Sequence, residues 1–147
     1  MNLKNKSRLF FFLCFGLIFH LSCDVDLYAQ NSREKDALKV FARFEEGIAE
    51  GSVDKFSIFF GTRNYLSLSN GVSGYYSANQ SYYVIKDFLS INEPTSFKLT
   101  NIVSETSTPF ASGILKYNSN GIRKNANVFI SLQRMNKNWY ISQITIN

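Results

Sequence analysis

Apolar positions in the first half of the chain recur every three or four residues, a spacing that predicts amphipathic helices. The first predicted helix runs from Arg33 to Glu50 and buries one stripe of side chains. The stripe consists of Leu38, Phe41, Phe44 and Ile48. Gly51 stands where a helix C-terminus favours glycine, and Ser52 is suited to be the N-cap of a second helix. Ser52 to Phe60 therefore predicts a short helix that ends before Gly61.

The next segment combines a short strand with a clear helix start. Asn64 to Ser69 alternates between apolar and polar residues, which predicts a strand. Ser77 and Gln80 have the spacing of a capping box, so a helix is predicted to begin at Ala78. Pro94 prevents this helix from continuing, because proline has no N–H to donate. The apolar face of the helix consists of Tyr82, Ile85, Phe88 and Leu89.

The last third of the chain changes to a period of two and is rich in β-branched and aromatic residues, which predicts strands. The predicted strands are Phe97 to Thr106, Phe110 to Tyr117, Ala126 to Met135 and Trp139 to Ile146. Turns at residues 118–121 and 136–138 contain Asn and Gly, which accept positive φ, so hairpins are expected there. Helices followed by successive antiparallel strands predict an α+β fold, with the N-terminal helices packed on a curved antiparallel sheet.

The first 29 residues have the pattern of a secretory signal peptide. Three of the first eight residues are basic and none is acidic, and Leu9 to Leu21 is almost entirely apolar. This run is shorter than the roughly 20 apolar residues that a membrane-spanning helix needs. We therefore expect residues 1–29 to be removed and residues 30–147 to form one α+β domain.

Two cleavage sites predict different attachments to the cell envelope. Cleavage after Ala29 follows the small-residue rule for secretory leaders and releases a periplasmic or secreted protein. The alternative is cleavage before Cys23, which would leave a lipoprotein anchored through that cysteine. The residues before Cys23 include His20 where such sites favour an aliphatic side chain, so the Ala29 site is preferred.

Composition excludes several classes of enzyme from the mature chain. His20, Cys14 and Cys23 are the only histidine and cysteines, and all three lie in the leader. Catalytic triads that use histidine, disulfides and zinc sites of histidine and cysteine are therefore excluded downstream of Ala29. No phosphate-binding glycine loop is present, and no cofactor or metal is expected. The adjacent acids Glu45 and Glu46 are interpreted as solvated helix surface.

Charge gives no sign of a nucleic-acid partner. Removal of the leader takes away three basic and two acidic residues, which leaves a net charge of +4. Lys116, Arg123 and Lys124 form the densest basic group and flank a predicted hairpin turn. Scattered surface charge of this kind is typical of solvated protein, so no nucleic-acid site is predicted.

The chain resembles a family of small secreted bacterial proteins known as domain of unknown function 4783. The resemblance depends on a G-x-Y-S-x-x-Q pattern, an acid and aromatic pair near a helix end, and a following strand. The matching residues are Gly74, Tyr76, Ser77, Gln80, Asp87, Phe88 and Phe97. Leu89 and Ser81 depart from the usual Phe and Ala. The resemblance implies the cone-shaped nuclear-transport-factor-2-like fold, also called cystatin-like, and implies no activity.

The candidate binding residues are aromatic side chains and one acid. They are Tyr65, Tyr76, Tyr82, Tyr83 and Asp87. Tyr82 and Tyr83 are adjacent on a helix, so one of them should be accessible to a ligand or partner. The first hypothesis is a non-enzymatic binding or accessory module for an envelope protein or a small apolar ligand. A separate possibility is a homodimer through the open sheet face. The alternative is an isomerase or dehydratase-like enzyme with an enclosed pocket, in which Asp87 would need a raised pKa.

Overall fold

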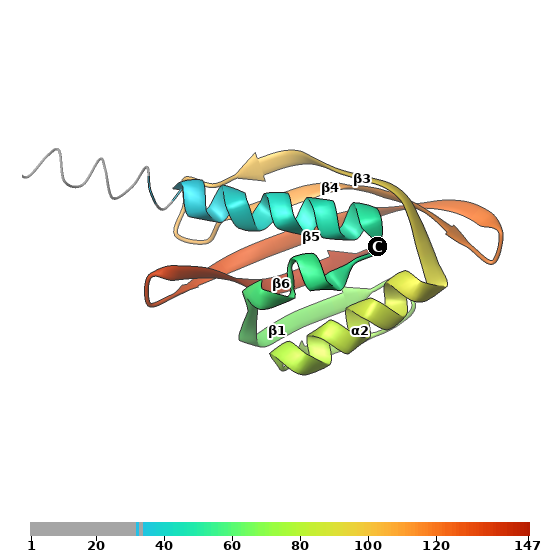
Figure 1. The fold of residues 1–147 in the computed structure, drawn as a ribbon, viewed down its shortest axis with the longest axis horizontal. Coiled ribbons are helices and arrows are strands. Elements are labelled where there is room, and N and C mark those ends of the chain that lie inside the picture. Colours follow the sequence, from blue (N-terminus) through green and yellow to red (C-terminus); the bar gives the residue numbers. More distant parts are fainter. Residues whose placement is uncertain (1–31, 33) are drawn as a thin grey trace, which may run out of the picture. The chain divides into compact units, whose positions relative to one another are not determined.

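The computed structural model describes residue 32 and residues 34–147, and it divides into the units Met1–Lys35 and Asp36–Asn147. Residues 32, 34 and 35 of the first unit are helical. The predicted leader, both cleavage sites and Cys23 lie outside the described residues. The second unit, Asp36–Asn147, contains the sheet and both of the longer helices (Figure 1).

This unit contains two longer helices and two short turns of 3₁₀-helix. Residues 36–50 are helical and α2 spans Ala78–Ile91. The prediction of one short helix from Ser52 to Phe60 is wrong. This segment instead forms two separate 3₁₀ turns, Val53–Lys55 (η1) and Ser57–Phe59 (η2). Gly61 does not end a helix but lies in the strand that follows.

Helix 36–50 buries a stripe that differs from the predicted one at its start. The buried residues are Ala37, Val40, Phe41, Phe44 and Ile48. Leu38 is 37% exposed, so its assignment to the stripe is wrong. Successive helical residues are about 100° apart, and Ala37, which lies one turn before Phe41, takes the inward position instead.

The capping box at the start of α2 is confirmed. The Gln80 backbone N–H donates to Ser77 Oγ at 3.3 Å, and the Ser77 N–H donates to Gln80 Oε1 at 2.9 Å. On the predicted apolar face, Ile85, Phe88 and Leu89 are buried, whereas Tyr82 is half-buried. The capping box therefore predicted the first residue of α2, Ala78, correctly.

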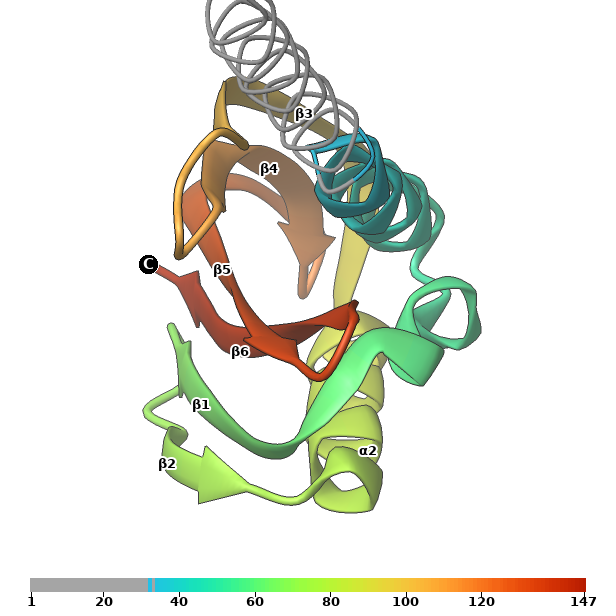
Figure 2. The same cartoon turned by 90° about the vertical axis from the view of Figure 1, so that its left-hand side faces the viewer.

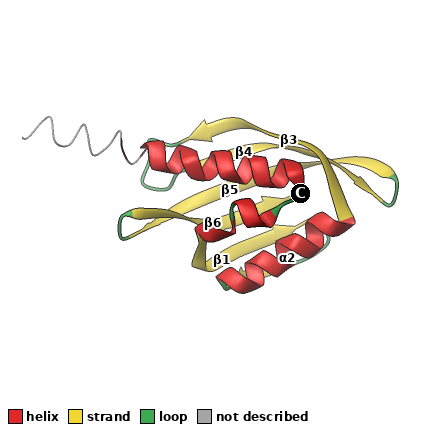
Figure 3. Cartoon of the chain, viewed as in Figure 1, coloured by secondary structure: helices red, strands yellow, loops and turns green. Residues whose placement is uncertain are grey.

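A single six-stranded sheet packs against the helices (Figure 3). Its strands are Phe60–Leu68 (β1), Ser73–Tyr76 (β2), Asn92–Val103 (β3), Phe110–Ser119 (β4), Ile122–Met135 (β5) and Asn138–Ile146 (β6). Their order is β2-β1-β6-β5-β4-β3, and only β1 and β6 run parallel. Figure 2 shows the sheet curving around the side that carries helix 36–50 and α2. The predicted α+β fold of helices on a curved sheet is confirmed.

The sheet differs from the predicted strands at its two edges and at the starts of β1 and β5, each of which begins four residues before the prediction. The edge strand β2 was not predicted, and β3 begins at Asn92, five residues before Phe97. Pro94 lies inside β3, where an edge position tolerates the missing N–H. The predicted hairpin turns are confirmed, with positive φ at Asn120, Gly121 and Asn136.

Aromatic side chains fill the space between helix 36–50 and the sheet. The Phe44 ring lies edge-on to Phe56 at 5.1 Å and to Phe97 at 5.9 Å between centroids. Phe56 also meets Phe60 edge-on at 5.8 Å. Gly47 faces the Phe56 ring so closely that a Cβ there would overlap it. Close packing of helix, 3₁₀ turns and strands therefore requires glycine in the last turn of this helix.

Candidate functional site

The predicted binding residues are distributed over both sides of the sheet. Tyr65 follows buried Asn64 and precedes buried Leu66 on β1, so its side chain points to the face opposite the helices. Tyr76, at the end of β2, packs against the hydrophobic core. The remaining three residues lie on α2. The fold therefore does not bring these five side chains into one cavity.

The α2 residues form a surface group. Tyr83 is 62% exposed and lies edge-on to Tyr82 at 5.1 Å, which confirms that one of the two tyrosines is accessible. The Tyr82 hydroxyl donates to Asp54 Oδ1 at 3.0 Å and thereby links α2 to η1. Asp87 is exposed. The isomerase or dehydratase alternative needs an enclosed carboxylate, and Asp87 does not meet that requirement.

A buried polar pair that sequence reasoning missed joins β1, β2 and α2. Asn64 and Ser81 are both fully buried, and Asn64 Nδ2 donates to Ser81 Oγ at 3.0 Å. The Asn64 amide also exchanges two hydrogen bonds with the backbone of Gly61, at 2.8 and 3.0 Å. The sequence contained only one indication of this pair, which is that Asn64 is a polar residue at an inward position of β1. Because its hydrogen bonds are satisfied, this pair is suited to holding the fold together.

The outward side of the sheet carries two rows of cross-strand neighbours that span all six strands. The first row is Tyr75, Tyr65, Gln143, Ser131, Phe110 and Val103. The second row is Ser73, Ser67, Thr145, Phe129, Ser112 and Asn101. None of these twelve residues is charged. We call these two rows the uncharged face.

Aromatic pairs lie at both ends of the uncharged face. Tyr65 and Tyr75 meet edge-on at 5.2 Å, and the Tyr65 hydroxyl lies 3.1 Å from Ser73 Oγ. Near the other end, the rings of Phe110 and Phe129 stack at 5.8 Å. A shallow depression of about 390 Å³ beside Phe129 continues the face toward β3 and β4. The Arg63 guanidinium lies 4.1 Å from the centroid of the Tyr75 ring, so a positive charge borders the face at its β2 end. The rest of the face combines aromatic rings with uncharged hydroxyl and amide groups, which is typical of the centre of a protein interface.

A second concave feature is an open groove between helix 36–50, η2 and β6. Its volume is about 270 Å³. Its lining residues are Asp36, Lys39, Val40, Ile58, Phe59, Asn138, Trp139 and Tyr140. Most of the lining is apolar or aromatic, and the charged groups are confined to one wall, on the helix.

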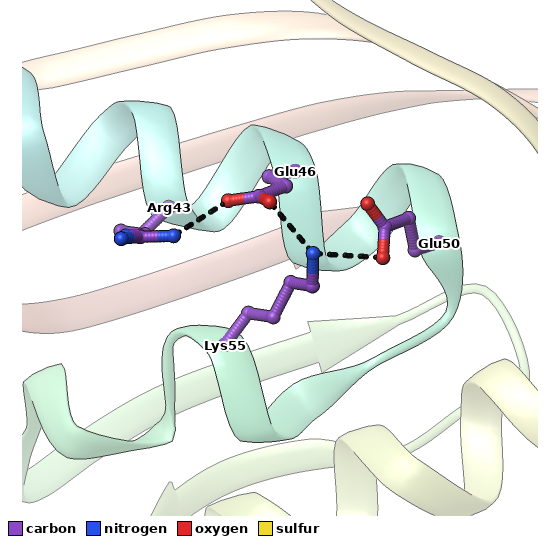
Figure 4. A network of polar contacts seen from close by, with 4 residues as sticks. All are labelled: Arg43, Glu46, Glu50 and Lys55. Atoms are coloured by element: carbon purple, nitrogen blue, oxygen red, sulfur yellow. Dashed lines mark hydrogen bonds and ion pairs between the residues drawn. The ribbon is translucent and has the colours of Figure 1, made fainter.

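Ion pairs attach helix 36–50 to η1 (Figure 4). Lys55 Nζ lies 2.6 Å from a Glu46 carboxylate oxygen and 2.8 Å from one of Glu50, and Arg43 lies 2.9 Å from Glu46. Hydrogen bonds from Lys55 and Arg43 lower the pKa of Glu46, and the two glutamates raise the pKa of Lys55. The side chain of Glu46 is 40% exposed, which agrees with its interpretation as solvated helix surface, but its ion pairs with Lys55 and Arg43 were not predicted.

Metal and membrane features can be assessed for the described part of the chain. In residue 32 and residues 34–147, no three His, Cys, Asp or Glu side chains converge as metal ligands would. Within the same residues, every helix is too short or too polar to cross a lipid bilayer.

Comparison with known proteins identifies the fold and its family. The family model for the domain of unknown function DUF4783 matches residues 41–147. A DUF4783 protein from Bacteroides ovatus is 22% identical with a TM-score of 0.63, covering 71% of this chain and 91% of its own. One from Bacteroides uniformis is 19% identical with a TM-score of 0.65, covering 72% and 94%. An NTF-2 like protein of unknown function from Shewanella oneidensis is 14% identical with a TM-score of 0.55, covering 76% and 96%. No curated protein matches the chain.

Proposed function

Because this chain belongs to the DUF4783 family, whose fold is nuclear-transport-factor-2-like and whose name assigns no activity, we propose that it is an exported, non-enzymatic binding module of the cell envelope. Its binding surface in this proposal is the uncharged face, and the partner is a second copy of the chain. The observation that carries the proposal is the absence of charge from twelve neighbouring positions across six strands.

Composition supports an interface on this side of the sheet. An open sheet face that only meets water usually alternates apolar residues inside with polar and charged residues outside. Here the outward positions instead combine Phe110, Phe129, Tyr65 and Tyr75 with small hydroxyl side chains. Protein interfaces are enriched in aromatic residues and depleted of charge at their centres, and the face matches that composition.

Charge supports a second copy as the partner. Without the leader the chain has a net charge of +4, so two copies repel each other wherever their basic residues meet. Away from the β2 end, where Arg63 lies over Tyr75, the uncharged face is a surface on which two copies can meet without that repulsion. Strands about 4.8 Å apart and same-face residues about 6.8 Å apart give the two rows an area of roughly 400 Å². This is below the ~800 Å² per partner of a standard interface, so we expect weak pairing.

A single substitution tests the dimer, because it appears in both copies of the chain at the interface. In a two-fold dimer, Ser112→Lys places two ammonium groups in the same interface. We expect sedimentation equilibrium to show a concentration-dependent dimer for the original chain and a monomer for Ser112→Lys. Ser90→Lys is the matched control, because Ser90 is exposed on α2, on the other side of the sheet. A monomer at every concentration, or a dimer that Ser112→Lys leaves intact, would contradict the proposal.

Export is the second part of the proposal and has its own test. Cleavage after Ala29 would give a soluble periplasmic or secreted protein beginning at Gln30. Cleavage before Cys23 would give a lipid-modified N-terminus. Mass spectrometry of the protein isolated from its native cells distinguishes the two forms, and an intact Met1 would contradict export.

A further inference from the structure

We propose that the groove between helix 36–50, η2 and β6 binds a small zwitterion with an apolar side chain, of the class of free α-amino acids. The groove shares no residue with the uncharged face, so this inference does not depend on dimer formation. Three properties of the groove support it: an apolar wall, a pair of unpartnered opposite charges and a small volume.

The apolar wall consists of residues from three separate elements. Val40 comes from helix 36–50, Phe59 from η2 and Trp139 from β6. Ile58 stands at the rim of the groove, and its side chain is 74% exposed. An apolar ligand group placed against this wall would cover Ile58 and remove apolar surface from water.

The charged wall differs from the rest of helix 36–50. The other four charged residues of this helix, Arg43, Glu45, Glu46 and Glu50, all form ion pairs. Among the described residues, Asp36 and Lys39 have neither an ion pair nor a side-chain hydrogen bond, and both line the groove. They lie three positions apart, so their side chains project from the same side of the helix.

One carboxylate and one ammonium group on the same wall complement a ligand that carries both charges. A ligand ammonium group would pair with Asp36 and a ligand carboxylate with Lys39, while the ligand side chain contacts the apolar wall. The volume of about 270 Å³ is below the range of drug-sized sites, which favours a ligand as small as one amino acid. Exposed pairs and a small apolar contact predict a Kd of about 1 mM.

The chain contains an internal reporter for this groove, because Trp139 is its only tryptophan. Three probes with the same phenyl group distinguish the contribution of the ligand ammonium group from that of the ligand carboxylate. L-Phenylalanine carries both charges, hydrocinnamate lacks the ammonium group and phenethylamine lacks the carboxylate. We expect L-phenylalanine to change Trp139 fluorescence in a saturable way and to bind about three times more tightly than either single-charge probe.

Two substitutions assign each charge to its partner. Asp36→Asn removes the partner of the ligand ammonium group, so L-phenylalanine should no longer bind more tightly than hydrocinnamate. Lys39→Gln removes the partner of the ligand carboxylate, so L-phenylalanine should no longer bind more tightly than phenethylamine. Asp87→Asn and Lys86→Gln make the same chemical changes on exposed α2 and should leave both preferences unchanged. Thermal unfolding of each variant checks that the fold is retained.

Several results would overturn the inference. Equal affinity for all three probes would contradict a role for the charges, as would a preference that survives both Asp36→Asn and Lys39→Gln. The absence of a saturable change in Trp139 fluorescence, together with an unshifted Trp139 indole proton in the NMR spectrum, would show that the groove does not bind this class of ligand.

Discussion

The carboxylate of Glu45, on helix 36–50, accepts a hydrogen bond from the backbone N–H of Leu99 on β3 at 2.8 Å. Its other oxygen lies 2.8 Å from Lys98 Nζ. Since β3 is the last strand in the sheet order, its outer edge has no neighbouring strand. Glu45 thus satisfies an edge N–H and attaches the helix to the sheet, and the interpretation of this residue as solvated surface is wrong.

Replacement of Glu45 should measure this attachment. Glu45→Ala leaves the half-buried Leu99 N–H without its partner, and we expect a loss of about 1–2 kcal/mol in the free energy of unfolding. Glu45→Gln keeps an amide oxygen for Leu99 and loses only the ion pair with Lys98, so it should cost less. Urea denaturation of both variants tests this order, and equal losses would contradict the role of the Leu99 hydrogen bond.

Acid should weaken the ion pairs between helix 36–50 and η1. The pKa of Glu46 in the folded protein lies below its ordinary value of 4.5 because Lys55 and Arg43 donate hydrogen bonds to it. Its contribution to stability is therefore present above that value and is lost as the pH falls through the lowered pKa. We expect unfolding free energy to decrease more steeply with acid in the original chain than in Glu46→Gln. Parallel pH profiles would contradict this.

Gly47 should not tolerate even a methyl group. Alanine is the better helix former, but a Cβ at position 47 would lie 2.7 Å from the Ser52 carbonyl oxygen and would overlap the Phe56 ring. We expect Gly47→Ala to destabilise the fold by about 1–3 kcal/mol. The loss should be smaller when measured in a Phe56→Leu background, because the smaller side chain relieves the overlap. Identical losses in both backgrounds would exclude this cause.

In the buried pair, replacement of Asn64 should lower the free energy of unfolding more than replacement of Ser81. Asn64→Leu leaves the Gly61 backbone groups and the Ser81 hydroxyl without this partner inside the protein, and we expect a loss of about 2–4 kcal/mol. Ser81→Ala removes one of several bonds to Asn64 and should cost about 1 kcal/mol. Thermal unfolding of both variants checks this difference, and a larger loss for Ser81→Ala would contradict it.

The sequence alone determined features that depend on neighbouring residues. Ser77 and Gln80 interact within one turn of helix, so the start of α2 was predictable. Asn120 and Gly121 accept positive φ by themselves, so the β4–β5 hairpin was predictable as well. The absence of histidine and cysteine downstream of Cys23 likewise excludes whole classes of chemistry, because composition is the same however the chain folds.

Only the tertiary structure decided which distant segments meet. The parallel pairing of β1 with β6 leaves no local signal in either strand, and the four-residue β2 is stabilised by β1 rather than by its own pattern. The uncharged face depends on five strand registers at once, because a shift of one residue would turn the side chains of a strand to the other side of the sheet. Glu45 meets Leu99 across 54 positions of the chain. Contacts of this kind depend on the packing of the whole domain, and no short window of sequence contains them.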